Sequence, residues 1–153
     1  MKRTVTAVMI ALCLALAGCT HNAAAPNTPA VPVDVRVAQY VQIVSTANAN
    51  LVPVVAALKD ANVITAANAQ KVAQYQVMVA TATNGMAGIL AQTNVAWPDR
   101  AILIQNLALS LVPPAGYESF GVKTDAQWQA LVMAVDGMES TIKIIVMMSQ
   151  QVK

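Results

Sequence analysis

Few residues in this 153-residue chain have side chains suited to catalysis, and they are unevenly placed. The two cysteines and the single histidine are Cys13, Cys19 and His21, so residues 22–153 contain neither type. A body without histidine or cysteine lacks the usual ligands of zinc and haem, and it lacks the base of a histidine-dependent triad. Chemistry in that body would depend on hydroxyl, carboxylate or thioether groups.

The hydroxyl and carboxylate groups with suggestive spacing lie near the C-terminus. Ser140-Thr141-Ile142-Lys143 resembles the Ser-x-x-Lys string of penicillin-interacting serine enzymes, but the companion Ser-Asp-Asn and Lys-Thr-Gly strings are absent. Glu139 precedes Lys143 by four residues, which favours an exposed ion pair on a helix. Asp136 could share that face, but a catalytic or metal site would need partners from other helices. We therefore predict no catalytic, metal-binding or cofactor-binding residues and no enzymatic activity.

The methionines could in principle bind a soft metal, but they more often fill gaps in a helical core. We expect the second role. The methionines that follow the N-terminal apolar run are Met78, Met86, Met133, Met138, Met147 and Met148.

The N-terminal residues have the order of an export signal. Lys2 and Arg3 are positive, Val5–Ala17 is apolar, and small residues precede the cysteine in Leu16-Ala17-Gly18-Cys19. These last four residues resemble the lipobox of bacterial lipoproteins, and the resemblance covers only this leader and Cys19. It implies cleavage between Gly18 and Cys19 and attachment of a diacylglyceryl group to the Cys19 sulfur.

This resemblance implies three segments. Residues 1–18 are a signal peptide that is removed, residues 19–33 carry the lipid and form an Ala/Pro-rich tether, and residues 34–153 form the folded domain. His21 lies in the tether, where a bystander role is expected. The lipid bilayer is then a partner through acylated Cys19. Because Thr20 is not the aspartate associated with inner-membrane retention, we expect the periplasmic face of the outer membrane in a Gram-negative bacterium.

Charge is sparse, at 10% of residues, and the net charge of +2 comes from Lys2 and Arg3. Without the leader, seven basic residues face seven acidic ones. Nucleic-acid binding usually needs a concentrated basic face, so we exclude it. A neutral surface with few charges is less protected against association, which favours a homo-oligomer or an envelope protein as partner.

Apolar residues at alternating spacings of three and four predict helices that begin near Asp34, Ala66, Trp97 and Thr124. The first ends within residues 59–64, the second near residue 93 and the third near residue 112, while the last runs almost to the C-terminus. The predicted core seams are Val37, Val41, Val44, Asn48, Leu51, Val55 and Leu58; Val72, Tyr75, Val79, Ala82, Met86 and Ile89; and Trp128, Leu131, Val135, Met138, Ile142 and Ile145.

Capping residues support the predicted helix starts. Asp34 and Thr65 are suited to the N-cap position, and Pro98 is suited to a first turn. The string from Thr124 to Gln127 has the form of a capping box. Trp97 then lies near the tether end of the domain, where we expect either a core position or contact with lipid headgroups.

Several residues should disturb the regular helices. Pro53 predicts a kink, or two abutting helices with the second beginning at Leu51. Asn48 on the seam either sets the register or is displaced by that kink. Asn84-Gly85 and Gly88 predict a close helix crossing or a local bend, with a helix break as the rival. The segment Ala101–Val112 is nearly all apolar, so we expect it to be buried on most sides.

Short connections favour antiparallel neighbours, so the predicted fold class is all-α. The architecture is an up-down helical bundle of three long helices and one shorter helix behind the tether. The expected function is that of a membrane-anchored, exported lipoprotein serving as a non-catalytic structural or protein-interaction module of the cell envelope. A carrier of an apolar ligand in the bundle core and a phage- or prophage-type envelope factor remain as alternatives.

Overall fold

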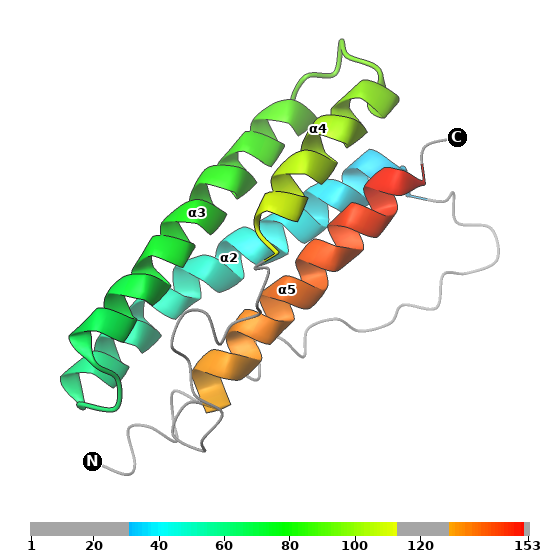
Figure 1. The fold of residues 1–153 in the computed structure, drawn as a ribbon. Helices are drawn as coiled ribbons and strands as arrows, with labels where there is room; N and C mark the ends of the chain where they lie inside the picture. The colour runs from blue at the N-terminus through cyan, green and yellow to red at the C-terminus, as the bar shows by residue number, and fades with distance from the viewer. Residues whose placement is uncertain (1–30, 113–128, 152–153) are drawn as a thin grey trace, which may run out of the picture. The chain divides into compact units, whose positions relative to one another are not determined.

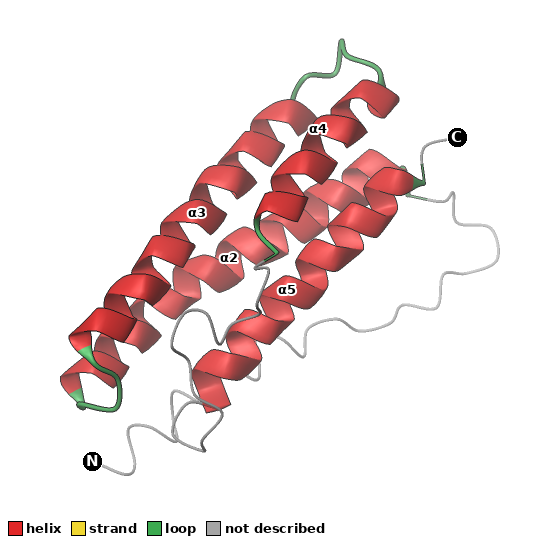
Figure 2. Ribbon diagram, viewed as in Figure 1, coloured by secondary structure: helices red, strands yellow, loops and turns green. Residues whose placement is uncertain are grey.

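The structure is a computed structural model that describes residues 31–112 and 129–151. Within these ranges it contains no strand and four helices: α2 (Val33–Asp60), α3 (Ala66–Leu90), α4 (Trp97–Ser110) and α5 (Gln129–Gln150). Their lengths are 28, 25, 14 and 22 residues. The predicted all-α bundle of three long helices and one shorter helix is therefore confirmed (Figures 1 and 2).

The four helices pack as a ring of neighbours. Helix α2 contacts α3 and α5, and α4 contacts the same two helices from the other side. Successive helices run in opposite directions, so the start of α2, the end of α3, the start of α4 and the end of α5 lie at one end of the bundle (Figure 1). This is the predicted up-down arrangement.

Helix α2 is uninterrupted from Val33 to Asp60 and includes Pro53, so the prediction of two abutting helices is wrong. Pro53 is exposed, which leaves the buried seam of the helix intact. The N-cap prediction is also wrong, because Pro32 occupies that position in an extended conformation. Asp34 lies in the first turn instead, where a carboxylate interacts favourably with the helix dipole.

The turn between α2 and α3 is formed by specific backbone hydrogen bonds. Asn62 adopts a left-handed conformation with φ of 55°. Its amide donates to the carbonyl of Lys59, and the next amide, of Val63, donates to the carbonyl of Leu58, both at 2.9 Å. This is a Schellman ending of the helix with asparagine in the place that glycine often takes. Thr65 then accepts from the Asn68 amide at 3.1 Å, which confirms the predicted cap of α3.

Helix α3 passes through Asn84-Gly85 without a break. A Cβ placed on Gly85 would lie 3.1 Å from the Cδ1 atom of Leu107 in α4. The glycine therefore permits the close approach of α4, as the first of the sequence-based alternatives states. Gly88 is different, because a Cβ there would meet no atom within 4 Å. Helix α3 ends at Leu90, three residues before the predicted end.

Helix α4 is not buried on most sides, contrary to the prediction. Ala101, Ile104 and Ala108 face the core with no exposed surface. Three other apolar residues of the helix point outward: Ile102, Leu103 and Leu109 are 58%, 49% and 48% exposed. The reason is the position of α4 in the ring, since a helix that contacts only two neighbours buries one face.

Helix α5 buries its predicted seam, from Leu131 to Ile145, and the buried stripe continues through Met148 and Ser149. The hydroxyl of Ser149 donates to the carbonyl of Ile145 at 2.8 Å, which satisfies this polar group inside the core. The predicted capping box that begins at Thr124, and Trp128, lie outside the described residues.

One described helix, α2, is long and apolar enough to cross a membrane by length and composition. A core helix passes the same test. Val37, Val44 and Leu51 of α2 have no exposed surface in the bundle, so burial against protein already accounts for the apolar character of its inner face.

Candidate functional site

The predicted lipid site precedes the described part of the chain. Gly18, Cys19 and the neighbouring His21 lie outside the described residues. Lipidation of Cys19 and cleavage after Gly18 therefore stay predictions.

The candidate catalytic string near the C-terminus is arranged as an ordinary helix surface. The Nζ atom of Lys143 lies 2.7 Å from Oε1 of Glu139, which confirms the predicted pair four residues apart. Ser140 and Asp136 are both exposed on the same helix. Among the residues that the structure describes, no three His, Cys, Asp or Glu side chains lie close enough together to hold a metal ion.

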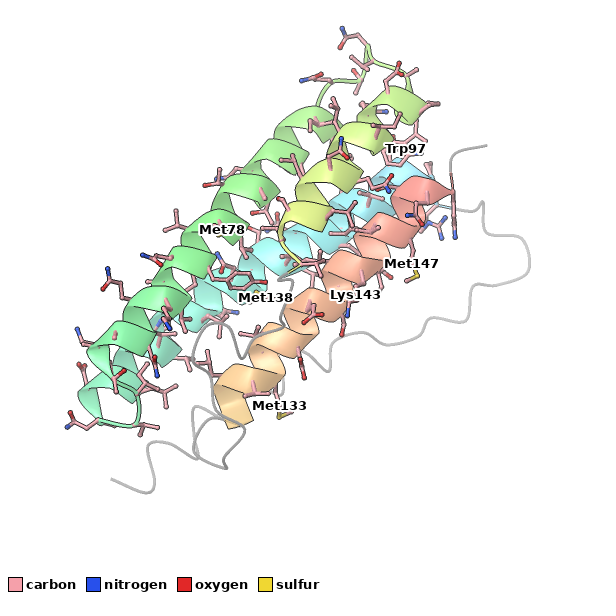
Figure 3. All side chains as sticks on the ribbon, viewed as in Figure 1. Met78, Trp97, Met133, Met138, Lys143 and Met147 are labelled. Carbon is pink, nitrogen blue, oxygen red and sulfur yellow. The ribbon has the colours of Figure 1, made fainter. Side chains whose placement is uncertain are left out.

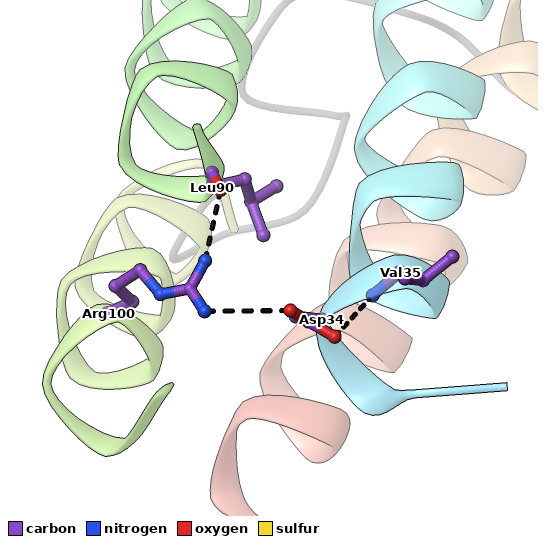
Figure 4. A network of polar contacts seen from close by, with 4 residues as sticks. All are labelled: Asp34, Val35, Leu90 and Arg100. Atoms are coloured by element: carbon purple, nitrogen blue, oxygen red, sulfur yellow. Dashed lines mark hydrogen bonds and ion pairs between the residues drawn. The ribbon is translucent and has the colours of Figure 1, made fainter. Parts of the chain in front are cut away.

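Arg100, in the first turn of α4, makes polar contacts with two other helices (Figure 4). It is buried, with 7% of its surface exposed. Its Nη1 donates to the carbonyl of Leu90 at 3.0 Å, and its Nη2 lies 3.5 Å from Oδ2 of Asp34. The guanidinium carbon also lies 5.6 Å from the centre of the Trp97 ring, within the range of a cation–π contact.

This cluster joins the ends of three helices. Leu90 is the last residue of α3, Asp34 is in the first turn of α2, and Arg100 is in the first turn of α4. The carboxylate of Asp34 and the carbonyl at the negative end of α3 both offset the guanidinium charge. The cluster therefore has a structural role, since it connects the ends of the three helices. Trp97 is half-buried beside it, and its contact with lipid headgroups stays a prediction.

A second buried polar contact joins α2 to α3. Asn48, 5% exposed, donates from Nδ2 to the backbone carbonyl of Gln76 at 2.9 Å. Asn48 thus lies on the seam as a register-setting residue and is not displaced by a kink. The Oδ1 atom of Asn48 and the Nε2 atom of Gln76 are buried without a hydrogen-bond partner. Two buried polar atoms without partners lower the free energy of unfolding, so substitution of Gln76 tests this contact.

Tyr75 is a buried titratable residue in α3. Its hydroxyl donates to the carbonyl of Leu111 at 3.4 Å, linking α3 to the residue that follows α4. Burial, and to a smaller extent the negative charge of Glu139, raise the pKa of Tyr75 to about 12. The phenol is therefore neutral at physiological pH.

The methionines divide into two groups. Met86, Met138 and Met148 are buried, as expected for core residues. The expectation is wrong for the others, which are exposed because they lie on outward faces of their helices (Figure 3): Met78, Met133 and Met147. Exposed methionines away from the core are typical of adaptable contact surfaces.

A shallow hollow of about 280 Å³ lies between α3 and α4. Val77 and Met78 line it from α3, and Leu107 and Leu111 line it from α4 and the residue after it. The hollow opens to solvent rather than into the bundle core. No charged residue occurs between Lys71 and Asp99, so its α3 wall is neutral.

Comparison of this chain with protein families, curated proteins and solved structures gives no significant match. The fold and the clusters described above are therefore the basis for any functional statement.

Sequence reasoning missed Arg100 and the exposed apolar side chains. A signal for Arg100 was present, because it is the only basic residue between Lys71 and Lys123. A basic residue with no other basic residue near it in the sequence is rarely buried unless it is paired. The spacing of apolar residues along the chain did not predict which of them are exposed, since exposure depends on which helices become neighbours.

Proposed function

We propose that this chain is an exported lipoprotein, anchored in a membrane through acylated Cys19, that serves as a non-catalytic structural or protein-interaction module of the cell envelope. The observation that carries the proposal is the order of positive, apolar and small residues that ends at Leu16-Ala17-Gly18-Cys19. Two or more acyl chains anchor a protein stably, so the bundle needs no membrane-binding face of its own.

The character of the bundle supports a binding role. Its described surface carries many exposed apolar side chains on α3, α4 and α5 and few charges. Its polar clusters, at Arg100 and at Asn48, connect helices to one another. A second copy or an envelope protein is the expected partner. The proposed location is the periplasmic face of the outer membrane, from the residue that follows Cys19.

Metabolic labelling with palmitate tests the anchor. The wild-type chain should incorporate label and sediment with outer-membrane fractions, while Cys19→Ser should do neither. Cys13→Ser, which changes the other cysteine, is the matched control and should behave as wild type. A wild-type chain that carries no label would overturn the proposal.

A carrier of an apolar ligand is the second candidate. The observation that favours it is the hollow between α3 and α4, whose lining is largely apolar. Its volume of about 280 Å³ lies just below the range of ligand pockets, which usually run from about 300 to 1,000 Å³ and enclose their ligand. Lipid that co-purifies with Cys19→Ser and is lost in Met78→Lys would support the carrier.

A further inference from the structure

Helix α5 carries a second regular stripe on the side that faces away from the core. Its members alternate spacings of four and three residues, as helices do where they pair with another helix. The stripe consists of Met133, Gly137, Ser140, Ile144 and Met147. Met133 and Met147 are 58% and 55% exposed, Ser140 is exposed, and the other two are partly exposed. Figure 3 shows both methionines outside the bundle, whereas Met138 lies between the helices.

The bundle itself does not explain this stripe. The inner seam of α5 already supplies its contacts to α2 and α4 through other residues, such as Met138 and Ile142. A Cβ on Gly137 would meet no atom within 4 Å, so packing among the described residues does not require a glycine there. Glycine in the middle of a helix is unfavourable by about 1 kcal/mol relative to alanine. A neighbour outside the chain would use the space that Gly137 leaves.

The residues beside the stripe carry charges of both signs. Asp136 and Lys143 are exposed and each immediately precedes a stripe residue, Gly137 and Ile144. Lys143 already pairs with Glu139, and its side chain remains 59% exposed. Within the described part of the chain, Asp136 has no ion-pair partner. In paired helices, such flanking positions set the orientation of the two helices.

These features match a second copy of the same helix in the opposite direction. With Ser140 opposite Ser140, Met133 falls opposite Met147 of the other copy, since each lies seven residues from the centre. Ile144 falls beside Gly137 of the other copy, so a large side chain meets a space. Asp136 falls beside Lys143 of the other copy, and the two-fold axis repeats this ion pair.

A parallel pair would lack these matches. It would place Gly137 against Gly137 and Ile144 against Ile144, and it would set Asp136 near Thr141 rather than near a cation. A self-complementary surface is what a two-fold dimer requires. The charge pattern and the size pattern therefore favour the same antiparallel arrangement.

We propose that α5 is the contact between two copies of this chain, packed antiparallel about a two-fold axis at Ser140. In this dimer a second copy is the partner expected in the proposed function. The proposal rests on that function only in one respect: membrane anchoring raises the local concentration of the two copies. The contact itself does not involve Cys19.

Cysteine cross-linking of the full chain in bacterial membranes tests the proposal. Ser140→Cys should form a disulfide-linked dimer well above the level of the wild-type chain, because residue 140 faces itself across the axis. Val52→Cys, on the exposed side of α2, and Val77→Cys, beside the α3–α4 hollow, are the controls. Dimer from Ser140→Cys that does not exceed both controls would overturn the proposal. Palmitate labelling of the same samples shows separately whether the anchor is present.

Two further variants test the direction of the helices. Met133→Cys alone should give no dimer, but it should cross-link to Met147→Cys when the two are co-expressed. Self-cross-linking of Met133→Cys at the level of Ser140→Cys would show a parallel pair and overturn the antiparallel arrangement.

Charge reversal tests the ion pairs in the Ser140→Cys background. Asp136→Lys and Lys143→Asp should each reduce the dimer about threefold, the size expected for two exposed ion pairs. The double variant restores opposite charges and should recover the dimer. If the amount of dimer stays low in the double variant while its circular dichroism spectrum is unchanged, the proposed register is contradicted.

Discussion

Arg100 and Asp34 form an ion pair of 3.5 Å between Nη2 and Oδ2 that connects the first turn of α4 to the first turn of α2. The same guanidinium donates to the last residue of α3, so one side chain contacts the ends of three helices. A buried charge is tolerated only with such partners, because its transfer from water is unfavourable. The contact therefore depends on all three helices being in place.

Replacing Arg100 should strongly destabilise the bundle. Arg100→Ala removes the hydrogen bond to Leu90, the ion pair and the contact with Trp97, and we expect the free energy of unfolding to fall by about 2–3 kcal/mol. Arg100→Lys should recover only part of the lost stability, because its ammonium group keeps the charge but lacks the planar fork of donors. Urea unfolding measures both. Arg36→Ala, at an exposed position of α2, is the control and should change the value by less than about 0.5 kcal/mol.

Replacing Gln76 by methionine should stabilise the protein. The change nearly conserves volume and removes the buried Nε2 atom that has no partner, while the backbone carbonyl still accepts from Asn48. We expect the free energy of unfolding to rise by about 1–2 kcal/mol. Gln74→Met, at an exposed position of the same helix, should have almost no effect. A loss of stability in Gln76→Met would indicate that its side-chain amide is hydrogen-bonded.

The two glycines of α3 should respond differently to alanine. Gly88→Ala should raise the free energy of unfolding by up to about 1 kcal/mol, because alanine is the better helix former and its Cβ meets nothing. Gly85→Ala should gain less, since its Cβ would lie 3.1 Å from Leu107 and that side chain must shift. Thermal or urea unfolding of both variants compares them directly. Equal gains would show that α4 does not approach α3 closely at Gly85.

Tyr75 should make stability depend on alkaline pH. Its pKa is about 10 in an unfolded chain and about 12 in the folded protein, so the unfolded state loses the proton first. The contribution to stability is complete below pH 10 and is lost as pH rises toward 12. Urea midpoints between pH 8 and pH 12 should fall more steeply for wild type than for Tyr75→Phe. Parallel curves would contradict the raised pKa.

Much of the bundle could be predicted locally. The spacing of Val37, Val44 and Leu51 in α2, and of Leu131, Met138 and Ile145 in α5, identified the faces that are buried. The Thr65 cap and the close approach at Gly85 were also predictable. These features depend on residues within a few turns of one another, and helical periodicity relates such residues without reference to the rest of the fold.

The sequence by itself thus determined where the helices form and which of their faces turn inward. It also predicts an N-terminal leader that ends before Cys19. The tertiary structure decided which neighbours each helix packs against. Helix α4 looked buried on most sides, yet its two neighbours leave Ile102 and Leu109 exposed. The partners of Arg100 and the outward direction of the α5 stripe were decided in the same way. Burial is a property of neighbours that are distant in sequence, so spacing along one helix cannot specify it.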